Sequence, residues 1–241
     1  MWTRISTPIQ RPSGIDQPRI QNDCRGSAPD SRILVGVRII TGSLRSRRLE
    51  APKGLGTRPT SDRLRETLFN VLAGRIQGAA FLDLYAGSGA VGIEALSRGA
   101  ARVEFVERDS AALKILRGNL ERLGLAGLET AGECHIHAAA VGATLRKMQR
   151  ASGMGQQAAK FDLVFLDPPW EAAEDYAATL GLLGGAAAGL LANGAEVIAE
   201  HRRKERLEDR YGLLERTRLL EQGDAALSFY AFGRSSAPEI H

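Results

Sequence analysis

Two short motifs hold the residues best suited to chemistry. The first runs Asp-Pro-Pro-Trp from Asp167 to Trp170, directly after the apolar run Phe161–Leu166. Two consecutive prolines cannot donate backbone hydrogen bonds and hold the chain extended, so an acid and an aromatic ring are fixed just past a strand. Open α/β sheets bind ligands at this carboxyl edge. The Asp167 carboxylate and the Pro168 carbonyl are suited to accept the N–H groups of a nucleobase amine, and Trp170 to stack on the base.

The second motif is a glycine turn, Ala86-Gly87-Ser88-Gly89, between an apolar run and a helical pattern. Glycines allow positive φ and close approach of a ligand to the backbone, and the helix start supplies free N–H groups for an anion. With Gly92 the turn fits G-x-G-x-x-G, and Glu107 follows Gly87 by 20 residues. That spacing is typical of a dinucleotide site, whose acid holds ribose hydroxyls.

Asp83, at the end of the strand before the turn, favours a different cofactor. A buried carboxylate is costly unless it is paired or faces a ligand. S-adenosylmethionine carries a cationic sulfonium and an ammonium but no phosphates, so it suits such a carboxylate better than a dinucleotide does. Glu107 would then accept hydrogen bonds from the ribose hydroxyls. The alternatives left open are that Asp83 only caps the turn and that Glu107 is a surface acid.

The wider pattern predicts an α/β fold with a mostly parallel sheet and helices on both faces, because short apolar runs alternate with helical ones. A helix is expected from about residue 63, capped by Ser61 or Asp62. The expected strands are Ala80–Tyr85, Arg102–Glu107, His135–Ala139, Phe161–Leu166, Glu196–Glu200, and an antiparallel pair near Arg218–Glu221 and Leu227–Phe232. The other expected helices are Val91–Ser97, Ser110–Leu123, Val141–Arg150 and Glu171–Leu183.

Charge divides the chain unevenly. Residues 1–65 carry 13 Lys and Arg against 5 Asp and Glu, whereas the remainder has a net charge of −4. A basic segment on a mildly acidic body indicates a polyanionic partner. The arginines proposed as RNA contacts are Arg38, Arg45, Arg47, Arg48, Arg63 and Arg65.

Composition restricts the class of protein further. Hydrophobic residues make up 44% of the chain, which permits a sizeable core, and the two cysteines exclude a disulfide scaffold. No metal site and no secretory signal are expected, and we predict a cytoplasmic monomer.

The predicted divisions are a disordered or spurious extension (1–34), a basic segment that binds RNA and closes over the cofactor (35–75), the catalytic domain (76–234) and a tail (235–241). Val35 or Val37 is a candidate start of the natural protein in place of Met1.

The motif set resembles bacterial 16S ribosomal RNA (guanine-N2)-methyltransferases. Asp167 to Trp170 matches the (Asp/Asn)-Pro-Pro-aromatic signature of methyltransferases that act on exocyclic amines. The other matching stretches are 38–42, the basic run 45–48, 57–60, 63–72, 83–99, 107–109 and 226–230, and the likeness covers about residues 37–233. The resemblance implies a Rossmann-like class I fold with seven strands in the order 3-2-1-4-5-7-6, the last inserted antiparallel.

The resemblance also implies roles for individual residues. The cofactor would be S-adenosylmethionine, and the substrate one guanine of small-subunit ribosomal RNA within a ribosomal subunit. Catalysis is assigned to Asp167, Pro168 and Trp170. The cofactor would be held by Asp83, Ala86, Gly87, Ser88, Gly89, Glu107 and Arg108, with Arg58 and Thr60 closing over it. Family members often carry Asp or Asn after the third strand to meet the adenine amine, where this chain has Ala138-Ala139.

Three other functions are consistent with parts of this sequence. A DNA adenine-N6 or cytosine-N4 methyltransferase shares the Asp-Pro-Pro-aromatic signature, an NAD-dependent oxidoreductase shares the glycines, and a non-catalytic RNA-binding assembly factor would need only the basic segment. Outside the two motifs, Glu200 and His201 are expected on the surface, and the charged run 202–210 is expected to be a solvated helix face.

Overall fold

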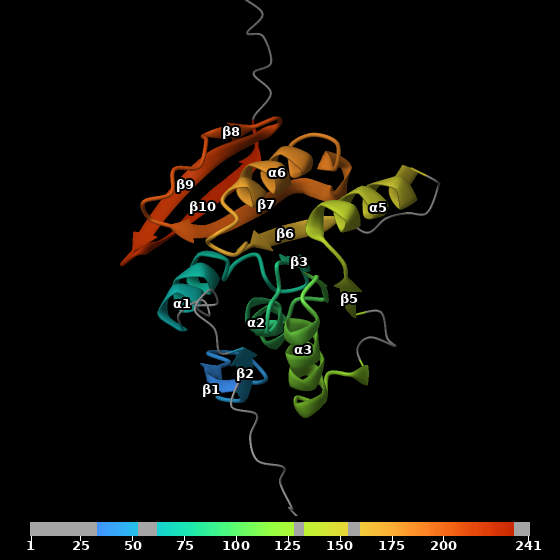
Figure 1. The fold of residues 1–241 in the computed structure, drawn as a ribbon, viewed down its shortest axis with the longest axis vertical. Helices are drawn as coiled ribbons and strands as arrows, with labels where there is room; N and C mark the ends of the chain where they lie inside the picture. Colours follow the sequence, from blue (N-terminus) through green and yellow to red (C-terminus); the bar gives the residue numbers. More distant parts are fainter. Residues whose placement is uncertain (1–32, 53–61, 128–132, 154–159, 234–241) are drawn as a thin grey trace, which may run out of the picture. The chain divides into compact units, whose positions relative to one another are not determined.

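The structure is a computed structural model that describes residues 33–52, 62–127, 133–153 and 160–233. The chain divides into two units, residues 1–31 and 32–241, and every described residue belongs to the second. That unit is built on an eight-stranded sheet in the order β5-β4-β3-β6-β7-β10-β9-β8 (Figure 1). The strands are β3 (Ala80–Leu84), β4 (Arg102–Glu107), β5 (Cys134–Ala138), β6 (Phe161–Leu166), β7 (Leu191–Arg202), β8 (Arg210–Tyr211), β9 (Leu214–Gln222) and β10 (Ala225–Phe232).

The pairing directions give this sheet two parts. Strands β5, β4, β3, β6 and β7 are parallel neighbours, whereas β10 lies antiparallel between β7 and β9. When β1, β2 and the two-residue β8 are left out of the numbering, the remaining seven strands lie in the order 3-2-1-4-5-7-6. The two-residue β8 adds an eighth strand that the sequence did not indicate.

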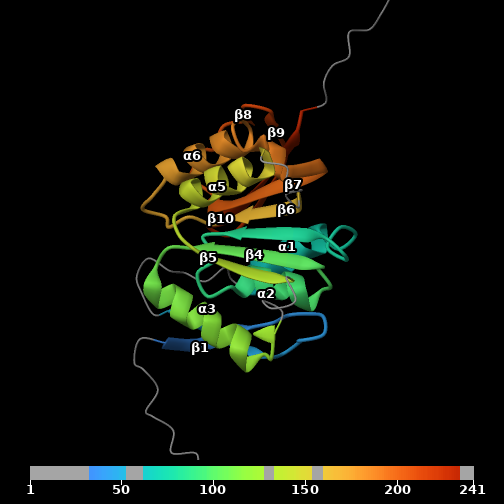
Figure 2. The ribbon, with the colours of Figure 1, turned by 90° about the vertical axis from the view of Figure 1, so that its right-hand side faces the viewer.

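Helices cover both faces of the sheet. One face packs against α1 (Asp62–Val71), α2 (Ala90–Ser97) and α3 (Ser110–Arg122), and the other against α5 (Val141–Gly153), α6 (Glu174–Leu183) and the short 3-10 turn Ala188–Leu190 (Figure 2). Among the described residues no helix is long and apolar enough to cross a membrane. The charged run 202–210, expected to be a helix, is instead the end of β7, a turn and the start of β8, so that expectation was wrong.

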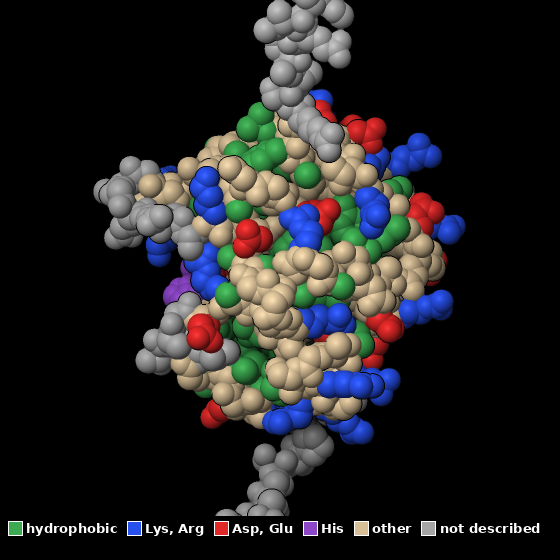
Figure 3. Space-filling view, turned by 180° about the vertical axis from the view of Figure 1, so that it is seen from behind, with side chains coloured by type: hydrophobic (Ala, Val, Ile, Leu, Met, Phe, Trp, Pro, Cys, Tyr) green, Lys and Arg blue, Asp and Glu red, His purple; other side chains and the backbone are tan. Residues whose placement is uncertain are grey.

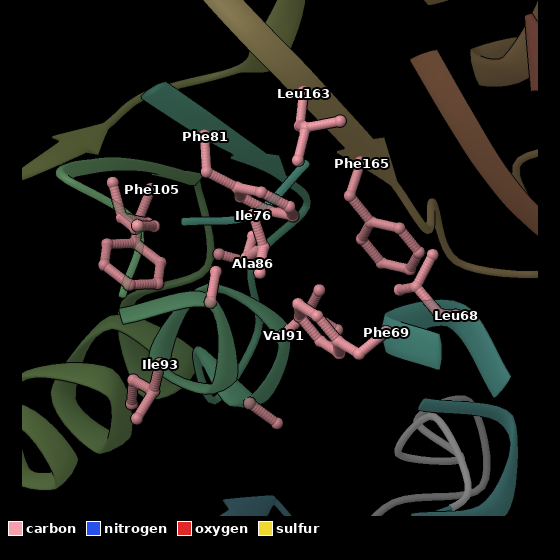
Figure 4. Packing of buried hydrophobic residues seen from close by; sticks show 14 of the residues in the cluster. Leu68, Phe69, Ile76, Phe81, Ala86, Val91, Ile93, Phe105, Leu163 and Phe165 are labelled. Carbon is pink, nitrogen blue, oxygen red and sulfur yellow. The ribbon is translucent and has the colours of Figure 1, made fainter. Parts of the chain in front are cut away.

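Strand alternation decides which side chains meet which helices. In β3, Phe81 packs on the α1–α3 face, whereas Leu82 and Leu84 pack on the α5–α6 face. Figure 4 shows Phe81, Phe105 and Phe165 packed against side chains from α1 and α2. By the same alternation Asp83 faces α2.

The N-terminal segment forms an antiparallel hairpin of β1 (Ile33–Arg38) and β2 (Arg48–Pro52). The sequence indicated a strand near 37–40 but only a loop from 44 to 59, so β2 was missed. Strand β2 contacts α3, and its Leu49 and Ala51 are buried in the same hydrophobic cluster as Leu116 of α3. Packing against α3 stabilises a strand here, although the local residue preferences do not predict one.

Candidate active site

A cavity of about 460 Å³ lies at the carboxyl ends of β3, β4 and β6, which is a size usual for a small-molecule site. Its walls come from the glycine turn, the end of β4, the start of α5, the Asp-Pro-Pro-Trp turn, and Ala51 of β2. Nine predicted residues line it together: Asp83, Ala86, Gly87, Ser88, Glu107, Arg108, Asp167, Pro168 and Trp170. Gly89 lies just behind this lining, and Arg58 and Thr60 lie outside the described residues.

The glycine turn has a left-handed backbone conformation that glycine adopts easily because it has no Cβ. Gly87 and Gly89 have φ of +56° and +79°, and a Cβ on Gly89 would lie 2.3 Å from Leu116 Cδ1. Tyr85, although not a glycine, has φ of +59° and lines the cavity. Its hydroxyl lies 2.8 Å from Oγ1 of Thr179 in α6. Backbone strain of this kind tends to concentrate at functional sites.

Asp83 both caps a helix and faces the cavity. Its Oδ2 accepts a hydrogen bond from the Gly92 N–H at 2.8 Å, near the start of α2. The side chain is only 2% exposed. Burial raises the pKa of Asp83 to about 8, the Gly92 hydrogen bond opposes this rise, and the charge of Glu107 adds to it. A cationic ligand in the cavity would stabilise the ionised form.

Glu107 fastens two loops of the cavity to each other. Its carboxylate accepts the N–H of Gly87 at 2.8 Å and the N–H groups of Arg108 and Asp109 at 2.7 Å. The Gly89 N–H donates to the Ala86 carbonyl. These bonds and the Asp83–Gly92 bond occupy the N–H groups of Gly87, Gly89 and Gly92. Three N–H groups at the turn and the start of α2 are therefore not free to bind a pyrophosphate.

Asp167 brings a carboxylate into the cavity from the Asp-Pro-Pro-Trp turn. It is half-buried, and the described residues give it no hydrogen-bond donor. Burial, together with the charges of Glu200 and Asp83, raises its pKa well above the ordinary value. An unpaired carboxylate in such a place costs stability, and a donor supplied by a bound molecule would relieve that cost.

Trp170 has a cation against one face of its ring. The guanidinium carbon of Arg202 lies 4.3 Å from the ring centroid, a cation–π contact. Leu166 at the end of β6 pairs with Ala199, so β7 extends past the end of β6 and carries Arg202 to this edge. Arg202 was assigned from the sequence only to a solvated run, and nothing local to it signals this contact.

The family comparison matches most of the chain. The family described as Conserved hypothetical protein 95 matches residues 37–231. The chain belongs to this family. It is 35% identical over 198 residues to "Putative rRNA methyltransferase YlbH" of Bacillus subtilis, covering 80% of this chain and 98% of that protein. It is 41% identical over 134 residues to "Ribosomal RNA small subunit methyltransferase D" of Escherichia coli, covering 56% of this chain and 60% of that protein.

The fold of this chain is also found in a solved structure. "Putative methyltransferase yhhF from Escherichia coli" superposes with a TM-score of 0.65 at 34% identity, covering 81% of this chain and 97% of that one. The cavity at the carboxyl edge of the sheet therefore belongs to a class I methyltransferase fold, as the motifs predicted.

Of the six arginines predicted to contact RNA, five are exposed and one, Arg65, is buried. The side chains of Arg38, Arg45, Arg47, Arg48 and Arg63 are exposed. Figure 3 shows Lys and Arg side chains at its lower end, the level at which Figure 1 draws β1 and β2. Arg65, however, is 0% exposed and donates to the Arg38 carbonyl at 2.5 Å and to Asp62 at 2.9 Å. A phosphate cannot reach this buried guanidinium, so its assignment as an RNA contact is corrected.

Two further residues beside Asp167 were expected on the surface and are buried. Glu200 and His201 are 4% and 3% exposed. The Tyr176 hydroxyl donates to the Glu200 carbonyl at 2.9 Å, and His201 Nε2 lies 2.9 Å from Ser228 Oγ. Burial lowers the pKa of His201. The expectation failed because β7 continues into the sheet between β6 and β10, which the sequence does not reveal.

One wall of the cavity is apolar. Ala139 and Ala140 line it with Val141 at the start of α5. Within the described residues no group of His, Cys, Asp and Glu could hold a metal ion.

Proposed function

We propose that this protein transfers a methyl group from S-adenosylmethionine to the N2 amine of a guanine in 16S ribosomal RNA. The observation that carries the proposal is the Asp167 carboxylate, which lies in the cavity without a hydrogen-bond donor from the described residues. The names of the two relatives support an rRNA substrate, and the fold supports methyl transfer.

The cavity residues fit this cofactor. Asp83 and Asp167 are both carboxylates whose buried negative charge a sulfonium and an ammonium would offset. The Gly87 and Ser88 backbone leaves room for close approach. Glu107 retains one acceptor site for a ribose hydroxyl, on Oε2, because Oε1 already accepts two N–H groups and Oε2 accepts one. Arg58 and Thr60 remain predicted closing residues. When bound, the cofactor supplies an electrophilic methyl group on a positively charged sulfur.

Asp167 and Pro168 orient the nucleophile. The lone pair of a guanine amine is delocalised into the ring, so the amine is weakly nucleophilic. When the Asp167 carboxylate and the Pro168 carbonyl accept its two N–H groups, the lone pair is directed toward the methyl group. The new N–C bond forms as the C–S bond breaks, and the extra proton on nitrogen then leaves to Asp167 or to water. Rate enhancement comes mainly from orientation.

Trp170 would hold the base. The guanine has to leave its stack to reach this cavity, at a cost of a few kcal/mol. Stacking on an aromatic ring returns about 1–3 kcal/mol of that cost. Because Arg202 covers one face of Trp170, the base would use the other face.

The RNA itself would meet the exposed arginines of the hairpin and of α1. For single-stranded RNA each neutralised phosphate changes the slope of log K against log salt concentration by about −0.7. We propose the small ribosomal subunit, assembled or assembling, as the partner that presents the guanine, and the cytoplasm as the location.

The decisive experiment incubates the protein with S-adenosylmethionine and small ribosomal subunits that lack the modification, then digests the RNA and identifies the methylated nucleoside by mass spectrometry. N2-methylguanosine is expected, and the Asp167→Ala variant should form it about 10³-fold more slowly. N6-methyladenosine or N4-methylcytidine, or methylation of DNA instead, would replace the proposal with the rival amino-methyltransferase. Calorimetry with NAD should show no binding, because the N–H groups of the three glycines in the G-x-G-x-x-G pattern already donate within the protein.

A further inference from the structure

The side chain of Asn119, near the C-terminal end of α3, is completely buried and makes four hydrogen bonds. Its Nδ2 donates to the Glu50 carbonyl and to the Ser88 carbonyl, each at 2.9 Å. Its Oδ1 accepts the Glu50 N–H at 2.9 Å and a Nη2 hydrogen of Arg122 at 2.7 Å. A primary amide has two donor hydrogens and two acceptor lone pairs, so the capacity of this side chain is fully used.

The bonds to Glu50 have the pattern of a strand pair. Strand β2 pairs with β1 on one edge, and Asn119 takes both the N–H and the carbonyl of Glu50 on the other. The amide thus satisfies an edge that would otherwise be open. An aspartate here would keep the acceptors but lose both donors, and it would place negative charge beside two carbonyl oxygens.

The hydrogen bond from Asn119 to Ser88 reaches the cofactor cavity. Ser88 belongs to the glycine turn and lines the cavity, and so does Ala51, the residue after Glu50 in β2. Asn119 therefore joins two walls of one cavity from behind. Figure 2 shows the hairpin alongside α3.

A second attachment of the hairpin region does not involve the cavity. The turn after β1 is held by the far half of α2, where Glu94 accepts the N–H groups of Ile40 and Thr41 at 2.7 and 3.0 Å. Ser97 Oγ donates to the Thr41 carbonyl at 2.6 Å and accepts the Leu44 N–H at 3.0 Å. These contacts dock the same segment without touching the glycine turn, so they offer a matched control.

We propose that Asn119 is a positioning residue that makes the β1–β2 hairpin part of the cofactor site, so that cofactor binding and hairpin docking stabilise each other. The inference rests on the proposed function for the identity of the cofactor. Such coupling is reciprocal. An RNA that binds Arg47 and Arg48 on the docked hairpin tightens cofactor binding by the same factor by which the cofactor tightens RNA binding.

The first test uses the unmodified protein. Hydrogen–deuterium exchange is measured on residues 37–51 with and without S-adenosylhomocysteine as the probe. The Glu50 amide, which donates to Asn119, is expected to exchange more slowly when the ligand is bound. Unchanged exchange across 37–51 at saturating ligand would overturn the inference even if no variant could be made.

The second test compares Asn119→Asp with Ser97→Ala. Asn119→Asp should lose about tenfold in affinity for S-adenosylhomocysteine and should lose the ligand-induced protection of Glu50. In turnover, KM for S-adenosylmethionine should rise by about that factor while kcat stays within about threefold. Ser97→Ala loosens the turn but should keep the protection and nearly all of the affinity. Equal losses in both variants, or none in Asn119→Asp, would contradict the role.

The two proposals fail in different ways. If the unmodified protein does not bind S-adenosylhomocysteine, the proposed function itself fails. If it binds the ligand but Asn119→Asp retains normal affinity and protection, only the positioning role fails. A protein that binds the ligand yet methylates no guanine leaves the exchange comparison fully valid.

Discussion

The two turns that line the cavity differ in how their polar groups are satisfied. Around the glycine turn the protein supplies its own partners, because Asp83 accepts from Gly92, Glu107 from Gly87, and the Ser88 carbonyl takes a hydrogen of Asn119. In the Asp-Pro-Pro-Trp turn the described residues give the Asp167 carboxylate no donor, and the prolines have no N–H to offer. In the first turn the protein itself supplies partners for these groups, whereas in the second the Asp167 carboxylate lacks a donor from the described residues.

This contrast separates binding from reaction. A turn whose groups are satisfied internally defines a shape for the part of the ligand that does not react. A buried acid without a donor is kept at a cost in stability, which is common where a protein has to engage a reacting group. The comparison can be sharpened by substitutions that alter one turn and leave the other unchanged.

The largest effect is expected from Asp167→Ala. Removal of the acceptor should lower kcat by about 10³-fold, the order seen when a single charge-stabilising contact is lost from an active site. Affinity for S-adenosylhomocysteine should change little, because the glycine turn is untouched, and the free energy of unfolding should rise. Activity assays, calorimetry and urea denaturation measure the three quantities. Full activity in this variant would remove the basis for distinguishing the two turns.

The pH dependence of stability should report Asp83. Its pKa is about 8 in the folded protein and 3.8 when unfolded, so the folded state holds the proton to higher pH. Without ligand, the free energy of unfolding should therefore fall as pH rises from about 4 to about 8, by on the order of 1.4 kcal/mol per pH unit for one such group. Asp167 acts in the same direction. Urea denaturation at a series of pH values measures the slope.

Asp83→Asn is the matched control for that slope. The amide keeps an oxygen for the Gly92 N–H but cannot ionise, so the dependence should become flatter while the helix cap survives. If the free energy of unfolding of the unmodified protein instead increases with pH, the ionised Asp83 carboxylate already has a stabilising partner in the folded protein and does not need a cationic ligand.

The smallest effect is expected at Trp170. Trp170→Ala should lower kcat/KM by about tenfold, within the 1–3 kcal/mol range of base stacking, and Trp170→Phe by much less because the ring remains. The chain has only one other tryptophan, Trp2, so a Trp2→Phe background isolates the fluorescence of Trp170. Quenching by a 16S rRNA transcript is expected. Fluorescence that ignores the RNA would assign the ring to packing with Arg202 alone.

The site motifs were predictable because each is local. The Asp-Pro-Pro-Trp turn and the glycine turn follow apolar runs, and parallel strands bring their carboxyl ends to one edge, so Asp83, Glu107 and Asp167 were expected together. Burial at the end of β7 was not predictable. Glu200, His201 and Arg202 resemble a polar strand end, but β7 stays paired with β10 along these three residues, and the first two are buried.

The sequence by itself determined the alternation of strands and helices and the chemistry at the carboxyl edge, since both depend on residue spacing along single elements. The tertiary structure alone decided the contacts between elements distant in sequence. Arg65 is buried because α1 packs on the sheet, and Asn119 meets Glu50 across 69 positions of chain. Such pairings depend on three-dimensional packing, which hydrophobic periodicity does not specify.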